Sequence, residues 1–178
     1  MAAGEKARGR PRDADKDDLI LKTAAAQFRS RGYEATTLDA VAKQAGIGKQ
    51  SIYRRWPSKA DLALTLLRQQ AQQEIPTNQG LIVFLEETGR TLSRSGSILR
   101  ALMAAAQSNP DLLNKLKAQL IEPRRASLAV VLEDMPEAKR EWAIAAIFGA
   151  VWYRLLLDEP LDGAFARGIS ALLADNVG

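Results

Sequence analysis

The sequence predicts an all-α protein of about nine helices, in which an N-terminal three-helix helix-turn-helix domain precedes a larger C-terminal helical domain. Three observations support this fold class. Apolar residues recur at helical spacing along most of the 178 residues, no segment of convincing length alternates as a strand does, and Gly, Pro and Asn residues separate the apolar segments. We expect an arm at 1–14, the helix-turn-helix domain at 15–60 and the larger domain at 61–178.

The expected arm is basic, contains Gly and Pro, and lacks the apolar residues that a core requires, so it should be disordered when alone. Its segment Arg8-Gly9-Arg10-Pro11 resembles the core of an AT-hook, and Arg12 follows it. Arginines on a flexible arm can enter a narrow, A·T-rich minor groove, where the negative potential is strongest. A solvated tail that only adds positive charge explains the same composition.

Residues 15–60 begin with an amphipathic helix that has apolar residues at helical spacing: Leu21, Ala24, Ala25 and Phe28. A second, shorter apolar face follows, at Leu38, Val41, Ala42 and Ala45. Thr37 is a suitable N-cap for this second helix, and Gly46 stands where a helix often ends in a left-handed residue. In the third helix, Ile52 would fill the angle between the two short helices.

This pattern leaves the other side chains of the third helix free to face outward, as in a helix-turn-helix that presents its second helix to the DNA major groove. We expect base contacts from Lys49, Gln50 and Ser51. We expect phosphate contacts from Thr37, Tyr53, Arg54 and Lys59. An ordinary helical hairpin shares the same spacing, and in it Tyr53 would be a half-buried packing residue.

Pro57 disfavours a helix that continues through Trp56, which we expect in the core of the small domain. Ser58 can cap the next helix, because Asp61 stands three residues later as in a capping box. The free amides at this helix start, together with Lys59, would suit a phosphate.

The segment from Leu19 to Leu62 resembles the DNA-binding domain of the TetR family of bacterial transcriptional regulators. The matching positions are Thr36-Thr37, Ala45-Gly46, Lys49, Ile52-Tyr53, Trp56 and Pro57-Ser58-Lys59. The chain departs from the family pattern at Gly48, at Gln50 and at Arg55-Trp56, and Gln50 bears on operator choice because Gln can bond an adenine edge at two atoms. The resemblance implies a homodimer with a ligand cavity in its helical body.

Charge is distributed unevenly along the chain. Residues 1–61 carry 13 Lys and Arg against 8 Asp and Glu, a net charge of +5, whereas residues 62–178 carry 12 against 13, a net charge of −1. A basic segment joined to a nearly neutral one suits a phosphate-binding domain beside one that does not touch nucleic acid. Chance asymmetry in a soluble protein is the alternative.

The sequence contains no Cys and no His, which excludes disulfides, thiolate chemistry and His-based catalysis. The acidic residues Asp15, Asp17 and Asp18 are typical of a first helical turn. We therefore expect neither an enzyme nor a metal site nor a cofactor. The chain begins without an apolar leader and has no run of about 18 apolar residues, so we expect a cytoplasmic protein with no membrane partner.

The larger domain should contain helices at about 61–74, 78–94, 97–108, 110–134, 136–157 and 161–175. Ser95-Gly96 would break the helical pattern between the second and third of these, and Asn109-Pro110 would restart it as cap and first residue. Pro123 can kink the longest helix.

The segment 142–157 is apolar almost all round, which indicates a helix buried on more than one side. We expect it to pair with its copy in a two-fold dimer through Trp142, Ala145, Ala146, Gly149, Ala150 and Tyr153. A central core helix of a monomer would show the same composition.

The candidate wall of an effector cavity consists of Phe84, Leu99, Leu102, Met103, Ala106, Phe148 and Trp152. Apolar stripes of this kind are most often simply core. Arg100 and Gln107 could add polar contacts if they faced inward, although their positions suit the surface.

We interpret the sequence as a ligand-responsive transcriptional regulator, most simply a repressor, that binds a palindromic double-stranded DNA operator as a homodimer and responds to an unidentified small molecule. Two alternatives remain at this point: a ligand-independent architectural DNA-binding protein, and a helical scaffold or enzyme with a non-functional headpiece.

Overall fold

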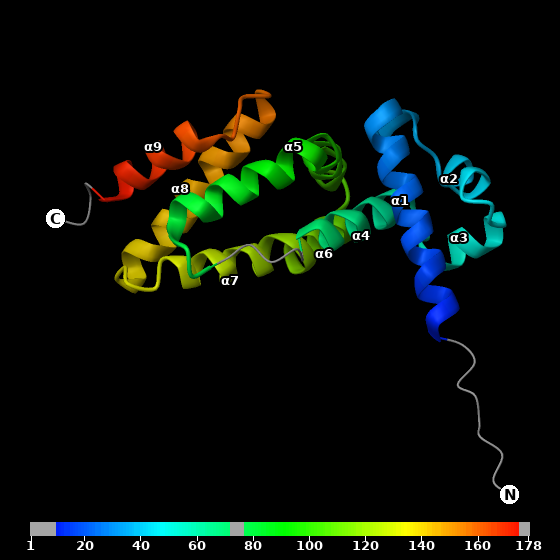
Figure 1. Cartoon of the computed structure of the whole chain (residues 1–178), viewed down its shortest axis with the longest axis horizontal. Helices are drawn as coiled ribbons and strands as arrows, with labels where there is room; N and C mark the ends of the chain where they lie inside the picture. The colour runs from blue at the N-terminus through cyan, green and yellow to red at the C-terminus, as the bar shows by residue number, and fades with distance from the viewer. Residues whose placement is uncertain (1–9, 72–76, 175–178) are drawn as a thin grey trace, which may run out of the picture. The chain divides into compact units, whose positions relative to one another are not determined.

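The computed structural model describes residues 10–71 and 77–174, all of whose regular elements are helices (Figure 1). The chain divides into two compact units, Met1–Leu66 and Leu67–Gly178, which we call the headpiece and the body. The boundary lies inside helix α4 (Lys59–Ala71), a few residues after the position expected from the sequence. Within the described ranges, no helix is long and apolar enough to cross a membrane.

The headpiece contains α1 (Arg10–Ala35), α2 (Leu38–Gln44), α3 (Lys49–Arg55) and the start of α4. Helix α1 already includes residues 10–14, which we expected in the arm, and it is interrupted near its end at Gly32, where φ is +79°. All four apolar positions expected on its inner face are buried, together with the apolar face of α2 as far as Ala42.

Gly46 connects α2 to α3 in the left-handed conformation, with φ at +67°, as its position after the apolar face predicted. The backbone N–H of Ile47 then donates to the Ala42 carbonyl over 3.0 Å, which closes the turn. Thr37 caps α2, because its Oγ1 accepts from the Ala40 N–H at 3.1 Å. Gly48 precedes α3 without any side-chain cap, and its φ of −69° is open to every residue.

The body contains α5 (Gly80–Ala106), α6 (Pro110–Leu116), the π-helical segment η1 (Lys117–Ile121), α7 (Glu122–Val131), α8 (Glu137–Leu156) and α9 (Gly163–Ala174). Helix α5 is central and contacts α6, α7, α8 and α9. Helices α6, η1 and α7 follow one another without a gap, as the single helix expected at 110–134 does. The described residues form eight continuous helices rather than the nine we expected, because the helices expected at 78–94 and 97–108 are one helix, α5.

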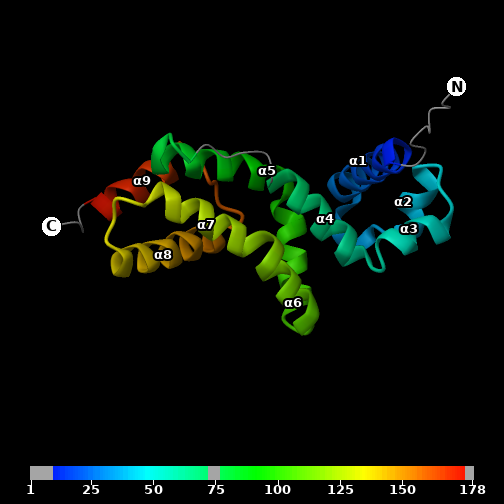
Figure 2. The same ribbon diagram turned by 90° about the horizontal axis from the view of Figure 1, so that it is seen from below.

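The expected break at Ser95-Gly96 is wrong, since α5 is helical throughout. Figures 1 and 2 show instead that α5 changes direction along its length. Thr88, Thr91 and Ser95 each donate a side-chain hydrogen bond to the carbonyl four residues earlier, a contact that bends helices. A Cβ at Gly96 would lie 2.6 Å from Leu155 Cδ1, so this glycine permits close packing against α8 rather than ending the helix.

The expected irregularity at Pro123 takes the form of the π-helical segment η1, which ends two residues before the proline. Proline has no N–H for the carbonyl four residues earlier, and its ring crowds that carbonyl. A local widening of the helix accommodates both effects, and the helix continues as α7.

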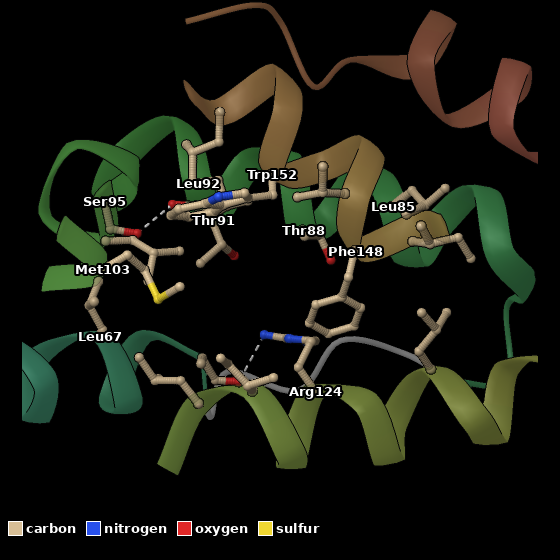
Figure 3. A pocket seen from close by; sticks show the side chains of 18 of the residues that line it. Leu67, Leu85, Thr88, Thr91, Leu92, Ser95, Met103, Arg124, Phe148 and Trp152 are labelled. Atoms are coloured by element: carbon tan, nitrogen blue, oxygen red, sulfur yellow. Dashed lines mark hydrogen bonds between the residues drawn. The ribbon is translucent and has the colours of Figure 1, made fainter. Parts of the chain in front are cut away.

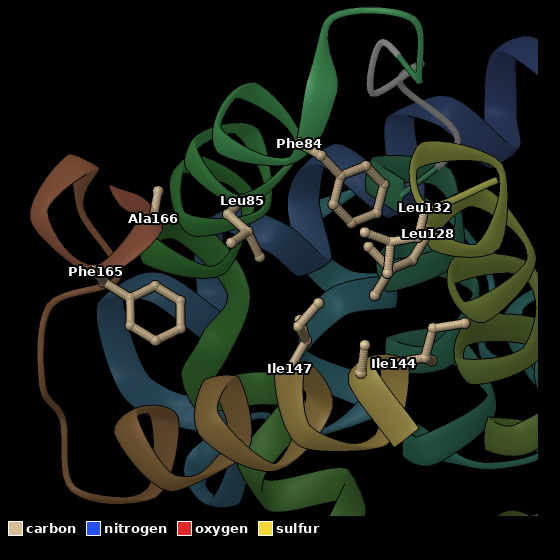
Figure 4. Close-up of a cluster of buried hydrophobic side chains, with 9 residues drawn as sticks. Phe84, Leu85, Leu128, Leu132, Ile144, Ile147, Phe165 and Ala166 are labelled. Carbon is tan, nitrogen blue, oxygen red and sulfur yellow. The ribbon is translucent and has the colours of Figure 1, made fainter. Parts of the chain in front are cut away.

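The apolar core of the body is formed by side chains from α5, α7, α8 and α9, together with Leu132 (Figure 4). It includes Phe84, Leu128, Ile144, Ile147 and Phe165. Helix α8 faces this core with one side only, since most of its small residues between Trp142 and Tyr153 are exposed. The expected burial of α8 on more than one side therefore does not occur within a single chain.

Gly46→Ala should lower the free energy of unfolding by about 1–2 kcal/mol, because an alanine pays the steric cost of the left-handed conformation. The matched control is Gly48→Ser, which should raise the free energy of unfolding by about 0.3 kcal/mol because the serine supplies the missing side-chain cap of α3. Urea denaturation followed by circular dichroism measures both. Equal effects of the two substitutions would contradict this account of the turn.

Candidate functional site

Helix α3 has a buried inner side and an exposed outer side. Ile52 is fully buried, and Trp56, which ends the helix, is also buried, as expected. On the outer side Lys49, Gln50 and Arg54 are exposed, and Tyr53 keeps 46% of its surface accessible. These four of the side chains that we expected to meet DNA therefore lie at the surface, and none of the four is needed to fill the core.

Lys49 forms an ion pair with Asp39 of α2, with Nζ and Oδ2 2.7 Å apart. The hydrogen bond that Lys49 donates to the Asp39 carboxylate, and then the charge of Asp39, raise the pKa of Lys49 from its ordinary value. Both side chains are substantially exposed, so the pair is worth little to folding and can be exchanged for another anion at small cost.

Ser51 is half-buried, and Arg55 holds its hydroxyl: Nη1 of Arg55 donates to Ser51 Oγ at 2.8 Å. Arg55 also donates from Nε to Asp17 Oδ1 of α1 at 2.6 Å, and only 14% of its side chain is accessible. Sequence reasoning assigned no role to Arg55. The structure shows that it ties α3 to α1, through a contact 38 residues apart that no local pattern reveals.

Lys59, the first residue of α4, does not extend freely into solvent. Its Nζ donates to the carbonyl oxygens of Tyr33 at 2.8 Å and Glu34 at 3.2 Å, and it lies 4.2 Å from the centre of the Tyr33 ring. Burial, followed by the charges of Glu34 and Asp61, raises the pKa of Tyr33, which stays neutral. Lys59 therefore fastens α4 to the end of α1, whatever else it binds.

Ser58 caps α4 as expected. Its Oγ accepts from the Asp61 N–H at 3.1 Å and donates to the Asp61 carboxylate at 2.7 Å. Of the arginines assigned to the arm, Arg8 lies outside the described residues. Arg10 and Arg12 belong to the first turns of α1, and the positions of their side chains are not described.

The body contains an apolar cavity of about 380 Å³, shown in Figure 3. Five of the seven residues that we expected in a cavity wall line it: Phe84, Leu99, Met103, Phe148 and Trp152. Leu102 and Ala106 do not, since both are fully buried in packing on another side of α5. A cavity of this size falls in the range of about 300–1,000 Å³ that small-molecule sites occupy.

The polar atoms in the cavity wall are few. Thr88, Thr91 and Ser95 contribute hydroxyls whose protons are already given to carbonyls of α5. Arg124 of α7 contributes the single charged side chain among the described lining residues, and sequence reasoning missed it. Arg100 points elsewhere, donating to the Leu155 carbonyl at 2.7 Å and to Asp158 at 3.0 Å.

The residues that we expected in a dimer interface form one exposed stripe along α8. Trp142 and Tyr153 keep 79% and 60% of their surfaces accessible, and Ala145, Ala146 and Gly149 are exposed as well, while Ala150 is half-buried. A Cβ added to Gly149 would meet nothing within 4 Å. Gly149 also borders the cavity, so the stripe and the cavity wall share this part of α8.

Taken together, these features define a helix-turn-helix DNA-binding protein: two short helices joined at a left-handed glycine, the second anchored by its inner residues and presenting a basic outer edge. Residues 20–66 match the family described as bacterial regulatory proteins, tetR family, and residues 76–173 match the tetracyclin repressor-like C-terminal domain. The chain belongs to the TetR family and is a transcriptional regulator of the helix-turn-helix type, a class that is not enzymatic.

Similar proteins agree with this assignment. The uncharacterized HTH-type transcriptional regulator YdeS of Bacillus subtilis is 28% identical over 91% of this chain and 89% of its own length. A Mycobacterium tuberculosis regulator of the same type, Rv1556, is 30% identical over 77% of this chain and 70% of its own length. The crystal structure of the TetR family transcription regulator SCO0332 gives a TM-score of 0.70 at 26% identity, covering 92% of this chain and 99% of that chain. Salmonella enterica GusR, at 18% identity and a TM-score of 0.65 over 93% and 94% of the two chains, shares the fold.

Lys59→Ala should lower the free energy of unfolding by about 1–3 kcal/mol, because it leaves two carbonyl oxygens without their charged donor. The matched control is Lys43→Ala, which removes an exposed lysine of α2 and should change stability by less than about 0.5 kcal/mol. Urea denaturation of both variants is the measurement. Equal stability of the two would mean that the contacts of Lys59 are not structural.

Proposed function

We propose that this TetR family regulator is a ligand-responsive repressor that binds a palindromic operator as a homodimer. The observation that carries the proposal is the division of α3 into a fully buried inner side, at Ile52, and an exposed outer side that bears Lys49, Gln50 and Tyr53. A helix held in this way can enter the major groove without rearranging the headpiece.

In this proposal Lys49, Gln50 and Ser51 contact base edges. The arrangement at the start of α3 supports it, because Arg55 fixes the Ser51 hydroxyl while Gln50 is free to form two hydrogen bonds with an adenine. Lys49 would exchange Asp39 for an acceptor on a guanine, at little cost because the ion pair is exposed.

Phosphate contacts would come from Thr37, Tyr53 and Arg54, whose side chains are exposed. Thr37 uses its oxygen as the cap of α2 and keeps its hydroxyl proton for a phosphate. Lys59 could contact a phosphate only in addition to the two carbonyls that it already binds, or by giving them up. Its main expected effect on DNA binding is therefore to position α4 and the end of α1.

The exposed stripe of α8 supports the homodimer. A large tryptophan and a tyrosine flank small residues that permit another helix to approach closely, and α9 adds an exposed Leu172. An apolar stripe of this kind is costly in water unless a partner covers it. Two copies joined by α8 and α9 would form a four-helix bundle and present two headpieces to half-sites one helical turn apart.

The cavity supports a ligand-responsive regulator over an architectural DNA-binding protein, which has no use for one. In the proposed mechanism the ligand-free dimer occupies the operator and blocks transcription. A ligand can release it only by binding the DNA-incompetent state more tightly. Helix α4 is a suitable link, because Leu67 and Ala71 near its end line the cavity while its first residue, Lys59, lies in the headpiece.

Selection of binding sites from random DNA duplexes with the full chain should yield a palindrome. Gln50→Ala should change the base preferred at one symmetric pair of positions, at a cost of about 1–3 kcal/mol for the lost contact. Sequencing of the selected pools measures both. Recovery of unrelated sequences, or of the same palindrome with unchanged preference in Gln50→Ala, would contradict the proposed readout by α3.

Arg54→Ala provides the complementary control. It should weaken binding to all sequences alike and reduce the slope of log affinity against log salt by about 0.9. Arg94→Ala, which removes an exposed arginine of α5 in the body, should leave both unchanged.

Ala146→Glu and Tyr153→Glu should each convert the homodimer to a monomer, because a carboxylate in the centre of an apolar interface is left without a partner. The control Ala126→Glu changes an exposed alanine of α7 and should leave the dimer intact. Light scattering coupled to gel filtration gives the masses. A monomeric wild-type protein, or dimers of both α8 variants, would refute this interface.

A further inference from the structure

Arg124 lies in the apolar cavity of the body without an acidic partner among the described residues. Its Nη2 donates a long hydrogen bond, 3.4 Å, to the Ala71 carbonyl, and its guanidinium lies 5.7 Å from the centre of the Phe84 ring. Figure 3 shows the side chain projecting from α7 into the space opposite Phe148 and Trp152. The neighbouring Arg125, by contrast, pairs with Glu141 at 2.8 Å.

In these surroundings the lost hydration of the guanidinium is only partly compensated by the protein. Burial lowers the pKa of Arg124 from its ordinary value, although guanidinium remains charged near neutral pH. A ring face and one long bond to a neutral carbonyl replace only part of the water that the guanidinium has lost. Most of its five N–H donors therefore remain available to a molecule that enters the cavity.

The remainder of the cavity wall favours a ligand that is mostly apolar. The described lining residues include no Asp and no Glu, so a cationic ligand would meet repulsion from Arg124 without compensation. The three hydroxyls of α5 have given their protons to backbone carbonyls. Among the described lining residues Arg124 is thus the single charged hydrogen-bond donor, and it stands in a wall made mostly of Leu, Phe, Met and Trp side chains.

We propose that the cavity binds an anionic amphiphile whose carboxylate, or chemically similar head group, pairs with Arg124 while its apolar chain lies against Phe148, Trp152 and Met103. The fork of guanidinium donors matches the two oxygens of a carboxylate or a phosphate. This inference rests on the proposed function only in naming the molecule as the effector. Binding itself does not depend on DNA.

Isothermal titration of the full chain with octanoate, decanoate and dodecanoate tests the proposal, with decanol and decyltrimethylammonium as neutral and cationic probes of similar length. Decyl phosphate distinguishes a phosphate head group from a carboxylate. At least one anion should bind about tenfold or more tightly than decanol, which corresponds to about 1.4 kcal/mol. Equal affinities for decanoate, decyl phosphate and decanol, or tighter binding of the cation, would overturn the proposal.

Two variants locate the head group. Arg124→Gln should reduce the affinity for the anion by about tenfold or more and leave that for decanol unchanged. Arg125→Gln, which changes the adjacent arginine in its exposed ion pairs, should leave both unchanged. Full anion affinity in Arg124→Gln would refute the assignment.

Stability gives a second measurement that does not depend on the choice of probe. Arg124→Met removes an incompletely compensated charge from an apolar cavity, so the melting temperature of the ligand-free protein should rise or stay the same. A clear fall would mean that the guanidinium is already satisfied by the protein, which contradicts the inference.

The two proposals can fail separately. If the anion binds through Arg124 but does not release a selected operator, the cavity assignment stands and the regulatory role is lost. If decanol or the cation releases the operator while the anions do not bind, the regulatory role stands and the inference about Arg124 is wrong.

Discussion

The proposed DNA interface depends on how α3 is anchored. A helix of seven residues is too short to be stable in water, so its existence and its direction come from the contacts of its inner side. Ile52 is fully buried there, Trp56 donates from Nε1 to Thr65 Oγ1 at 3.0 Å, and Arg55 joins the helix to Asp17 of α1. Because these three residues make the stabilising contacts of the inner side, the outer residues contribute little to stability. Their identities can therefore be selected for DNA recognition.

The sequence predicts the features of this headpiece that arise within a few residues. Gly46, the caps at Thr37 and Ser58, and the burial of Trp56 all follow from local sterics or from helical periodicity. The ties of Arg55 to Asp17 and of Lys59 to Tyr33 could not be predicted, because they join residues 38 and 26 positions apart. Lys59 illustrates the consequence: spacing alone suggested a phosphate contact, whereas two carbonyls already hold the ammonium group.

The body shows the same division between local and distant effects. Periodicity identified which side of α5 and α8 faces inward, so most of the expected cavity residues do line the cavity. Periodicity cannot distinguish a buried residue that lines a cavity from one that is packed on all sides. For this reason Leu102 and Ala106 were expected in the cavity wall, whereas both are fully packed elsewhere. Ser95-Gly96 failed as a predicted break, because Gly96 is required by the approach of Leu155 rather than by a chain reversal. Arg124 reads as an ordinary surface residue of α7 until the surrounding helices enclose it.

In the proposed mechanism, helix α8 connects ligand binding with dimerisation. One part of its surface supplies Phe148 and Trp152 to the cavity, and another carries the exposed stripe from Trp142 to Tyr153. On the opposite wall, Arg124 bonds the Ala71 carbonyl at the end of α4. An anion that draws the guanidinium toward itself would compete with that bond, so its charge would act on the helix that continues into the headpiece. If DNA affinity falls by some factor when the ligand binds, ligand affinity must fall by the same factor when DNA binds, because both describe one coupling free energy. The weak 3.4 Å bond is suited to this role, since a stronger one would hold Arg124 away from the ligand.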